Sequence, residues 1–197
     1  YALQLDTGNT GTFDSFFSSL LGGLTSKFNT DKFDFLVNNA GIGVTAVFAE
    51  TTEEQLDLLT NIHFKGPFFL TQKALPYMND GGGIVNLSTG LTRIILPYYP
   101  AYASTKAAME TLTTYLAKDL GGRGIRVNIV APGAIETDFA GGMVRDNSDM
   151  NKHIASQTAL GRVGLPTDIG SVVAFLCTEE ANWITAQRIE VSGGQML

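Results

Sequence analysis

The chain has 197 residues, of which 44% are hydrophobic and 16% are charged, and its formal net charge is −6. This composition is typical of one soluble globular domain and excludes a disordered or fibrous segment. The acidic balance argues against nucleic-acid binding, since such proteins usually carry a basic face, and no apolar run reaches the roughly 18 residues that a membrane span needs.

Strand-like apolar runs alternate with longer helical segments along the chain, which indicates a parallel sheet covered by helices on both faces. The predicted strands are Tyr1–Leu5, Phe33–Asn38, Gly83–Leu87, Ile125–Ala131 and Arg188–Val191. The predicted helices are Thr12–Phe28, Thr52–Met78, Ala101–Leu120 and Pro166–Cys177. Repeats and linkers are absent from the sequence, so we assign all 197 residues to a single α/β domain.

Three of the predicted strands are followed by small or polar residues, at 38–41, 88–90 and 132–137. The carboxyl ends of parallel strands meet at one edge of a sheet, where open α/β sheets bind their ligands. A hydroxyl at such a strand end can hydrogen-bond a substrate carbonyl, although capping of the strand is an alternative role. For Asn38 and Asn39 we favour a structural role, in which they tie neighbouring loops together.

A tyrosine and a lysine lie four residues apart in the predicted helix Ala101–Leu120. Tyr102 and Lys106 therefore share one face of that helix. A nearby ammonium favours phenolate over phenol, so we expect Lys106 to lower the pKa of Tyr102 and to let it exchange a proton with a substrate oxygen. The same spacing also occurs by chance in ordinary amphipathic helices, and the pair alone does not establish a function.

Five motifs follow one another along the chain: Asn-Asn-Ala-Gly at 38–41, Ser-Thr-Gly at 88–90, Tyr-Ala-Ser-Thr-Lys at 102–106, Pro-Gly-Ala-Ile-Glu-Thr at 132–137, and the tail from Trp183 to Gly194. In their order and spacing they resemble the short-chain dehydrogenase/reductase family, and the resemblance covers nearly the whole chain. It implies a Rossmann-like doubly wound sheet. It also implies an oxidoreductase that transfers a hydride between NAD(P)(H) and a small carbonyl or alcohol substrate.

The resemblance also implies the roles of the catalytic residues. Tyr102 would be the general acid/base, and Lys106 would lower its pKa and bind the nicotinamide ribose. Asn61 would hold a water in the proton relay. Thr89 stands where the family usually has a serine that polarises the substrate; threonine keeps the hydroxyl donor but adds a methyl group. Ser88 is the alternative to Thr89.

The implied cofactor is NAD or NADP, with NADP favoured by family analogy. Asp6 would lie near the adenine. The other implied contacts, besides Tyr102 and Lys106, are Asn38, Ala40 and Gly41 along the adenosine ribose and diphosphate, and Pro132, Gly133, Ile135 and Thr137 around the nicotinamide. The segment between Thr137 and Leu165 is expected to close over the substrate as a lid.

A glycine-rich GxGxxG turn between a strand and a helix is absent from these residues, and the glycines at 81–83, 121–124 and 192–194 are predicted to form turns. Tyr1–Leu5 resembles the third strand of the family. We therefore expect the natural protein to be longer, with a βαβα portion before residue 1 that holds the phosphate-binding turn and the residues that choose between NAD and NADP. The 197 residues alone are not expected to be active.

Two other functions stay open. One is a non-catalytic binding or assembly module, motivated by the absent phosphate-binding turn; it predicts no cofactor-dependent turnover. The other is a sugar-nucleotide epimerase, which shares Tyr-xxx-Lys but generally carries a larger C-terminal substrate region. The resemblance further implies a homodimer or homotetramer, formed by the helices Thr52–Met78 and Ala101–Leu120.

The cysteine and the two histidines add little to this picture. Cys177 has no partner for a disulfide or a CxxC zinc site, and its apolar surroundings favour a packing role. A lone cysteine predicts a reducing compartment, and we expect a cytoplasmic protein. His63 and His153 form no recognisable pair with a nucleophile or with metal ligands, so we expect ordinary polar or core roles for them and no bound metal.

Overall fold

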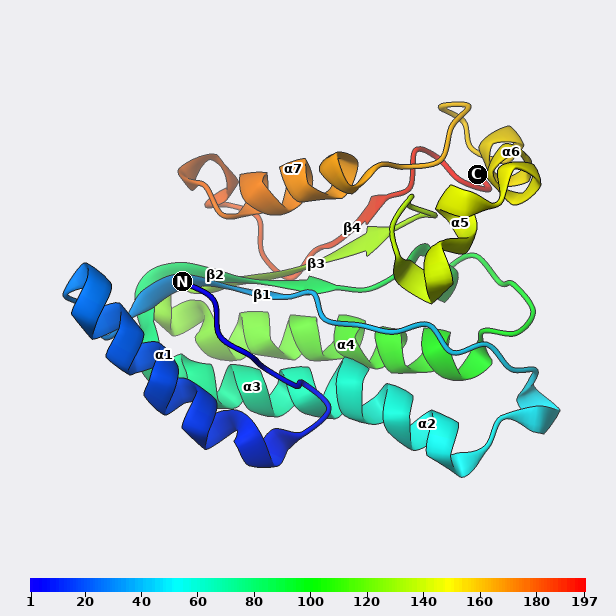
Figure 1. Cartoon of the computed structure of the whole chain (residues 1–197). Coiled ribbons are helices and arrows are strands. Elements are labelled where there is room, and N and C mark those ends of the chain that lie inside the picture. Colours follow the sequence, from blue (N-terminus) through cyan, green and yellow to red (C-terminus); the bar gives the residue numbers. More distant parts are fainter.

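A four-stranded parallel sheet forms the middle layer of the computed structural model, which describes residues 1–197 (Figure 1). Its strands are β1 (Phe33–Asn38), β2 (Met78–Leu87), β3 (Arg126–Pro132) and β4 (Arg188–Val191), in the spatial order β1-β2-β3-β4. All three pairings are parallel, so the carboxyl ends of the strands meet at one edge. The predicted Rossmann-like α/β architecture is confirmed.

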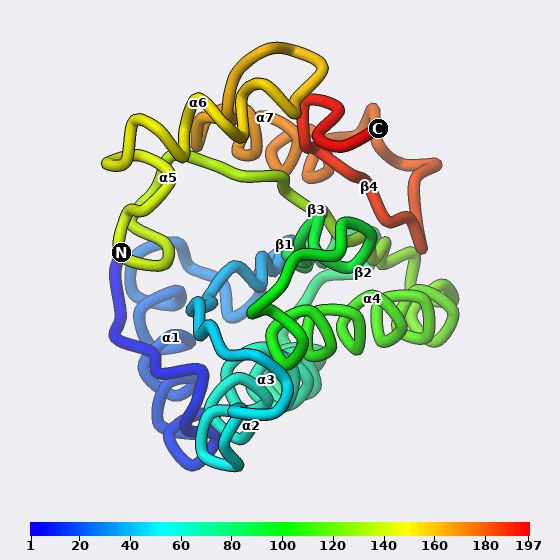
Figure 2. The backbone as a smooth tube through the Cα atoms, turned by 90° about the vertical axis from the view of Figure 1, so that its right-hand side faces the viewer, coloured from blue at the N-terminus to red at the C-terminus, as the bar shows by residue number.

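Helices cover both faces of this sheet. In Figure 1, α1 to α4 lie on one face and α7 lies on the other, and Figure 2 shows the same separation from a second direction. Two short helices, α5 and α6, follow β3 beyond its carboxyl end. The helices are α1 (Phe13–Phe28), α2 (Glu53–Thr60), α3 (Gly66–Ala74), α4 (Pro100–Leu120), α5 (Met143–Asp146), α6 (Ser148–Ser156) and α7 (Pro166–Leu176).

The two faces of the sheet are buried in separate hydrophobic clusters. In β2, Ile84 packs with residues of α4, whereas the next residue, Val85, packs with Leu176 of α7. In β3, Val127 belongs to the cluster that contains Ile84, and Val130 belongs to the cluster that contains Val85. Successive side chains of a strand point to opposite faces, so a strand that is covered on both sides is apolar without interruption.

The predicted helix Thr52–Met78 is interrupted in the structure. α2 ends at Thr60, a π-helical turn (η3) covers Asn61–Lys65, α3 follows, and Met78 already belongs to β2. Pro67 has no N–H and cannot donate the α-helical hydrogen bond to the carbonyl of His63. The turn widens immediately before this proline, and the N–H of Gly66 bonds to the carbonyl of Asn61, five residues back.

The predicted strand Tyr1–Leu5 is wrong as well, because these residues are irregular chain. β1 pairs only with β2, so residues 1–5 have no ladder partner, and the Tyr1 hydroxyl donates to the Ser19 carbonyl of α1 instead.

The turn predicted for the glycines at 81–83 is not found. These glycines lie inside β2, where the pairing with β1 is irregular and Gly81 has a φ of +79°. The structure also adds α5 and α6, which the sequence pattern did not reveal.

Gly66 is required by close packing at the start of α3. A Cβ at this position would lie 2.0 Å from the backbone carbonyl oxygen of Thr7. We expect Gly66→Ala to lower the free energy of unfolding by about 1–3 kcal/mol, because the backbone of the Thr7 turn must move. Gly22→Ala in α1 is the matched control: nothing lies within 4 Å of its Cβ, and alanine there should stabilise by about 0.5–1 kcal/mol. Equal urea midpoints for the two variants would contradict this account.

Candidate active site

Tyr102 and Lys106 lie in the first two turns of α4, which begins at Pro100. Their side chains are only 6% and 5% exposed. The Lys106 Nζ atom lies 6.0 Å from the centroid of the Tyr102 ring. The predicted pair therefore shares one face of the helix, and that face is buried against the carboxyl ends of the strands.

The Lys106 ammonium donates one hydrogen bond, to the carbonyl of Leu87 at the end of β2 (2.9 Å). An ammonium carries three N–H donors, so two remain for other partners. A Cβ on Gly41 would lie 3.5 Å from Nζ, which places the ammonium beside the turn that follows β1. Burial lowers the pKa of Lys106 to about 8. The group is therefore mainly charged at pH 7.

Burial raises the pKa of Tyr102 to about 12, and the Thr89 hydroxyl acts in the opposite direction. The expectation that Lys106 brings this pKa below its usual value is not met. The physical reason is desolvation: a phenolate loses its hydration when the ring is buried, and the ammonium, 6.0 Å from the ring centroid, does not offset that loss. Tyr102 consequently keeps its proton at neutral pH.

Thr89 and Ser88 point to different partners at the end of β2. The Thr89 hydroxyl accepts from the N–H of Leu91 and lies near Tyr102. The Ser88 hydroxyl instead donates to Glu110 Oε1 (2.5 Å). Of the two, Thr89 is the residue that the structure brings to Tyr102.

A network of polar side chains holds the end of β2 in place. Glu110 Oε1, on α4, accepts hydrogen bonds from Ser88, from Thr92 and from Arg188 of β4. Arg188 also donates to the carbonyl of Thr89. Side chains from α4, β4 and the β2 end thereby fix the backbone that presents the Thr89 hydroxyl.

His63 lies beside Tyr102, whereas the catalytic role expected for Asn61 stays a prediction. The two rings pack edge to face, with centroids 5.3 Å apart. Residues two apart on a helix point in nearly opposite directions, and the Asn61 side chain makes no hydrogen bond within the chain. Sequence reasoning missed His63, although it continues the buried helical stripe between Leu59 and Leu70.

Most of the residues predicted to bind the cofactor lie at the carboxyl ends of β1 and β3, whereas Asp6 lies in the N-terminal segment. Asn38 has a structural role, because its amide N–H groups donate to Thr71 and Asn86. Ala40 and Gly41 are exposed, directly after β1. Pro132 is the last residue of β3 and Gly133, Ile135 and Thr137 follow it; all four are half-buried. The Asp6 carboxylate is exposed and accepts a hydrogen bond from the N–H of Gly8.

This edge fits a hydroxyl-bearing ligand such as a nicotinamide ribose. The backbone at Ala40 and Gly41 carries almost no side chain, so a planar ligand can approach it closely. The two unused N–H donors of Lys106 lie next to this turn and match ribose hydroxyls in chemistry. No group of three or more His, Cys, Asp or Glu side chains is arranged to hold a metal ion.

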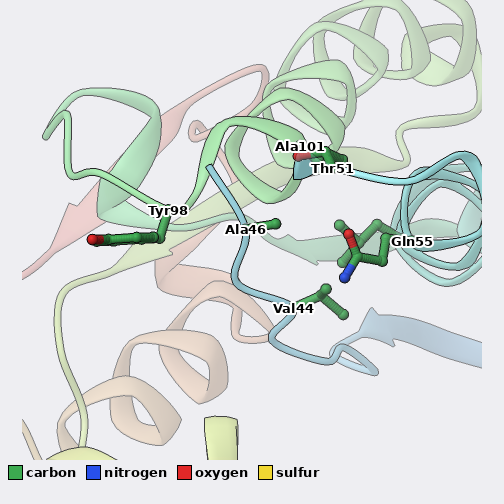
Figure 3. A pocket seen from close by; sticks show the side chains of 7 residues that line it. Val44, Ala46, Thr51, Gln55, Tyr98 and Ala101 are labelled. Atoms are coloured by element: carbon green, nitrogen blue, oxygen red, sulfur yellow. The ribbon is translucent and has the colours of Figure 1, made fainter. Parts of the chain in front are cut away.

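The segment after β3 places Phe139 against Tyr102. The Phe139 ring lies 5.8 Å from the Tyr102 ring, and a Cβ on Gly43 would lie 3.1 Å from Phe139. Figure 3 shows a small hollow at the start of α4, lined mostly by apolar residues: Val44, Ala46, Thr51, Gln55, Leu59, Tyr98 and Ala101. Ala101 connects this hollow to Tyr102, the next residue.

A family model described as enoyl-(acyl carrier protein) reductase matches residues 4–196. An uncharacterised oxidoreductase of Methylorubrum extorquens is 37% identical over 163 residues, which cover 83% of this chain and 66% of the relative. A 3-oxoacyl-[acyl-carrier-protein] reductase of Thermotoga maritima is 38% identical over 169 residues, covering 84% and 67%. The chain spans about two thirds of the length of these relatives.

Solved structures give the same result over the entire chain. The promiscuous reductase LugOII, which catalyses keto-reduction at C1 during lugdunomycin biosynthesis, has a TM-score of 0.94 and 39% identity, covering 100% of this chain and 78% of its own. The angucycline C-6 ketoreductase LanV with bound NADP has a TM-score of 0.92 and 36% identity, covering 100% and 75%. A short-chain dehydrogenase/reductase from Serratia marcescens has a TM-score of 0.88 and 29% identity, covering 100% and 76%.

No helix is both long and apolar enough to cross a membrane. The fold, the buried Tyr102–Lys106 pair at the carboxyl ends of the strands, and the match over residues 4–196 agree with one another. The chain belongs to the short-chain dehydrogenase/reductase family, whose members are oxidoreductases.

Proposed function

We propose that the protein is an NADPH-dependent ketone reductase in which Tyr102 gives its proton to the carbonyl oxygen of the substrate. The observation that carries this proposal is geometric: the buried phenol of Tyr102 lies beside the Thr89 hydroxyl and the Lys106 ammonium, at the carboxyl ends of the strands. In the direction of reduction the carbonyl oxygen needs a proton as it becomes an alcohol, and Tyr102, whose pKa burial raises to about 12, holds one at neutral pH.

Three polar side chains divide the work of this reaction. The Thr89 hydroxyl orients and polarises the carbonyl, and the Tyr102 hydroxyl donates the proton. Lys106, charged at neutral pH, stabilises the tyrosinate that remains and binds ribose hydroxyls with its two unused donors. The nicotinamide cofactor, when bound, supplies the hydride.

The cofactor would lie along the strand ends. Ala40 and Gly41 would face its ribose and diphosphate, while Pro132, Gly133, Ile135 and Thr137 would surround the nicotinamide ring. We favour NADP over NAD because LanV contains NADP and another similar structure, a blue fluorescent protein from a metagenomic library, is a complex with NADPH. That protein is 31% identical, with a TM-score of 0.87.

The surroundings of Tyr102 favour a ketone with an apolar body. The ring of Phe139 packs near Tyr102, and the hollow beside Ala101 is mostly apolar. Ile95 and Tyr98, which precede α4, are 83% and 57% exposed and add apolar surface at this end of the helix. The reductases LugOII and LanV act on ketones, which agrees with this substrate class.

Removal of the Tyr102 hydroxyl tests the proposal. We expect Tyr102→Phe in the intact protein to lose about 100- to 10,000-fold in kcat for ketone reduction, because no other acid replaces the phenol, while cofactor affinity is kept. Tyr99→Phe is the matched control: its ring lies 6.2 Å from that of Tyr102, and its turnover should remain near that of the unmodified protein. NADPH-dependent turnover that survives in Tyr102→Phe would contradict the assignment, and its absence from the unmodified protein would favour a non-catalytic module.

The pH dependence of reduction should follow Lys106. Its pKa of about 8 means that the ammonium loses its charge as the pH rises through 8, whereas Tyr102 stays protonated up to about pH 12. We therefore expect kcat/KM for reduction to fall above about pH 8 and to be flat from pH 6 to 7.5. In Lys106→Arg, which stays charged, this decline should move to higher pH. A decline at the same pH in both proteins would show that another group is responsible.

A further inference from the structure

We propose that His63 is a positioning residue of this active site, a neutral imidazole that fixes the Gly41-Ile42 turn relative to Tyr102 and Lys106. The proposal rests on the proposed function, since the turn would carry the cofactor and the pair would carry out the proton transfer. His63 itself touches neither substrate nor reacting atoms, and acts through the groups that it joins.

The imidazole of His63 is 1% exposed and uses both of its nitrogens. Nε2 lies 3.0 Å from the backbone nitrogen of Ile42, and Nδ1 lies 3.3 Å from Thr105 Oγ1. The Thr105 hydroxyl in turn donates to the Tyr102 carbonyl (2.9 Å). A continuous chain of hydrogen bonds therefore runs from the turn after β1, through η3, to the first turns of α4.

The direction of each hydrogen bond fixes the tautomer of His63. A backbone N–H can only donate, so Nε2 must present its lone pair to Ile42. Thr105 uses its hydrogen for the Tyr102 carbonyl, so its oxygen accepts the proton of Nδ1. The ring is therefore neutral, with its hydrogen on Nδ1. An imidazolium would lose the bond to Ile42 and would stand close to the Lys106 ammonium.

The electrostatic surroundings agree with this geometry. Burial and the charge of Lys106 together lower the pKa of His63 to about 3. Of the neighbours described around the ring, Lys106 is the charged group, and Tyr102 and Thr105 are neutral hydroxyl-bearing residues. The imidazole thus stays uncharged throughout the range in which the enzyme would work.

Gly41 shows why the position of this ring matters for the reaction. A Cβ on Gly41 would lie 3.3 Å from His63 Nε2 and 3.5 Å from Lys106 Nζ. The turn after β1 therefore rests on both groups, and the Tyr102 ring packs edge to face on the imidazole. Loss of the imidazole would release the turn and leave space beside Tyr102, so that cofactor, lysine and tyrosine would lose their mutual alignment.

The test compares three variants of the intact protein. His63→Leu removes both polar contacts at similar size, whereas His63→Gln keeps an acceptor near the Nε2 position. Ser171→Leu is the control, because Ser171 is exposed on α7, outside the segments that surround the site. We expect roughly a 10- to 100-fold loss of kcat in His63→Leu with little change in the KM for the ketone, recovery of most of this loss in His63→Gln, and no change in Ser171→Leu.

A second measurement does not depend on activity. Long-range ¹H–¹⁵N NMR of the unmodified protein should show one histidine locked as the neutral Nδ1–H tautomer from pH 5 to 9, and this signal should disappear in His63→Leu. Folded His63→Leu with an unchanged kcat, or an Nε2–H tautomer, would overturn the proposal. If the unmodified protein reduced no ketone, the proposed function would fail, and the tautomer would decide whether His63 holds the turn. If His63→Leu did not fold, His63→Gln and the tautomer would still decide.

Discussion

The buried ammonium of Lys106 is the constraint on which the site depends. A charge that is 5% exposed requires polar partners, and the chain supplies one, the carbonyl of Leu87 at the end of β2. This single bond ties α4 to the sheet edge and sets the distance between Lys106 and the turn at Gly41. The donors that remain are directed to the place where a family member would bind its cofactor.

Burial shifts the pKa values of Tyr102 and Lys106 in opposite directions, and both shifts serve the same reaction. Desolvation disfavours every charged form, so it raises the pKa of a phenol and lowers that of an amine. Tyr102 therefore remains a proton donor, while Lys106 is charged yet close to losing its proton at slightly alkaline pH. Burying both groups costs desolvation free energy, which the packing of the surrounding residues must offset. The same packing must hold the strand ends in place. The Glu110–Arg188 ion pair behind Thr89 and the His63 contacts beside Gly41 supply that rigidity.

The sequence predicted the parts of the fold that follow from local patterns. The strands Phe33–Asn38 and Arg188–Val191 have the predicted bounds, because apolar runs of this length between polar turns leave little choice of boundary. Helical spacing was enough to put Tyr102 and Lys106 on one face, and the strand end was enough to place Thr89 near them. The prediction of a strand at Tyr1–Leu5 failed because a strand needs a neighbouring strand to pair with, and apolar composition alone does not provide one.

Two features of the site could not be obtained from sequence patterns. The first is the place of His63 beside Tyr102: the direction of a side chain depends on the phase of its helix, and the π-helical turn before Pro67 changes that phase. The second is the pKa of Tyr102. The spacing to Lys106 suggested a decrease, but the sign depends on how completely the ring is buried, which only the packing of α4, η3 and Phe139 determines.

The central claim is that Tyr102 is kept protonated by burial and is thereby ready to donate. Its most direct test is a ¹³C NMR titration of the intact protein with labelled tyrosine Cζ, in which the Tyr102 signal is identified by its loss in Tyr102→Phe. We expect this signal to stay at the phenol position through pH 10 and to move only near pH 12, or not before the protein unfolds. A phenolate signal at pH 8 would contradict it, and would show that the lysine, rather than burial, sets the state of the tyrosine.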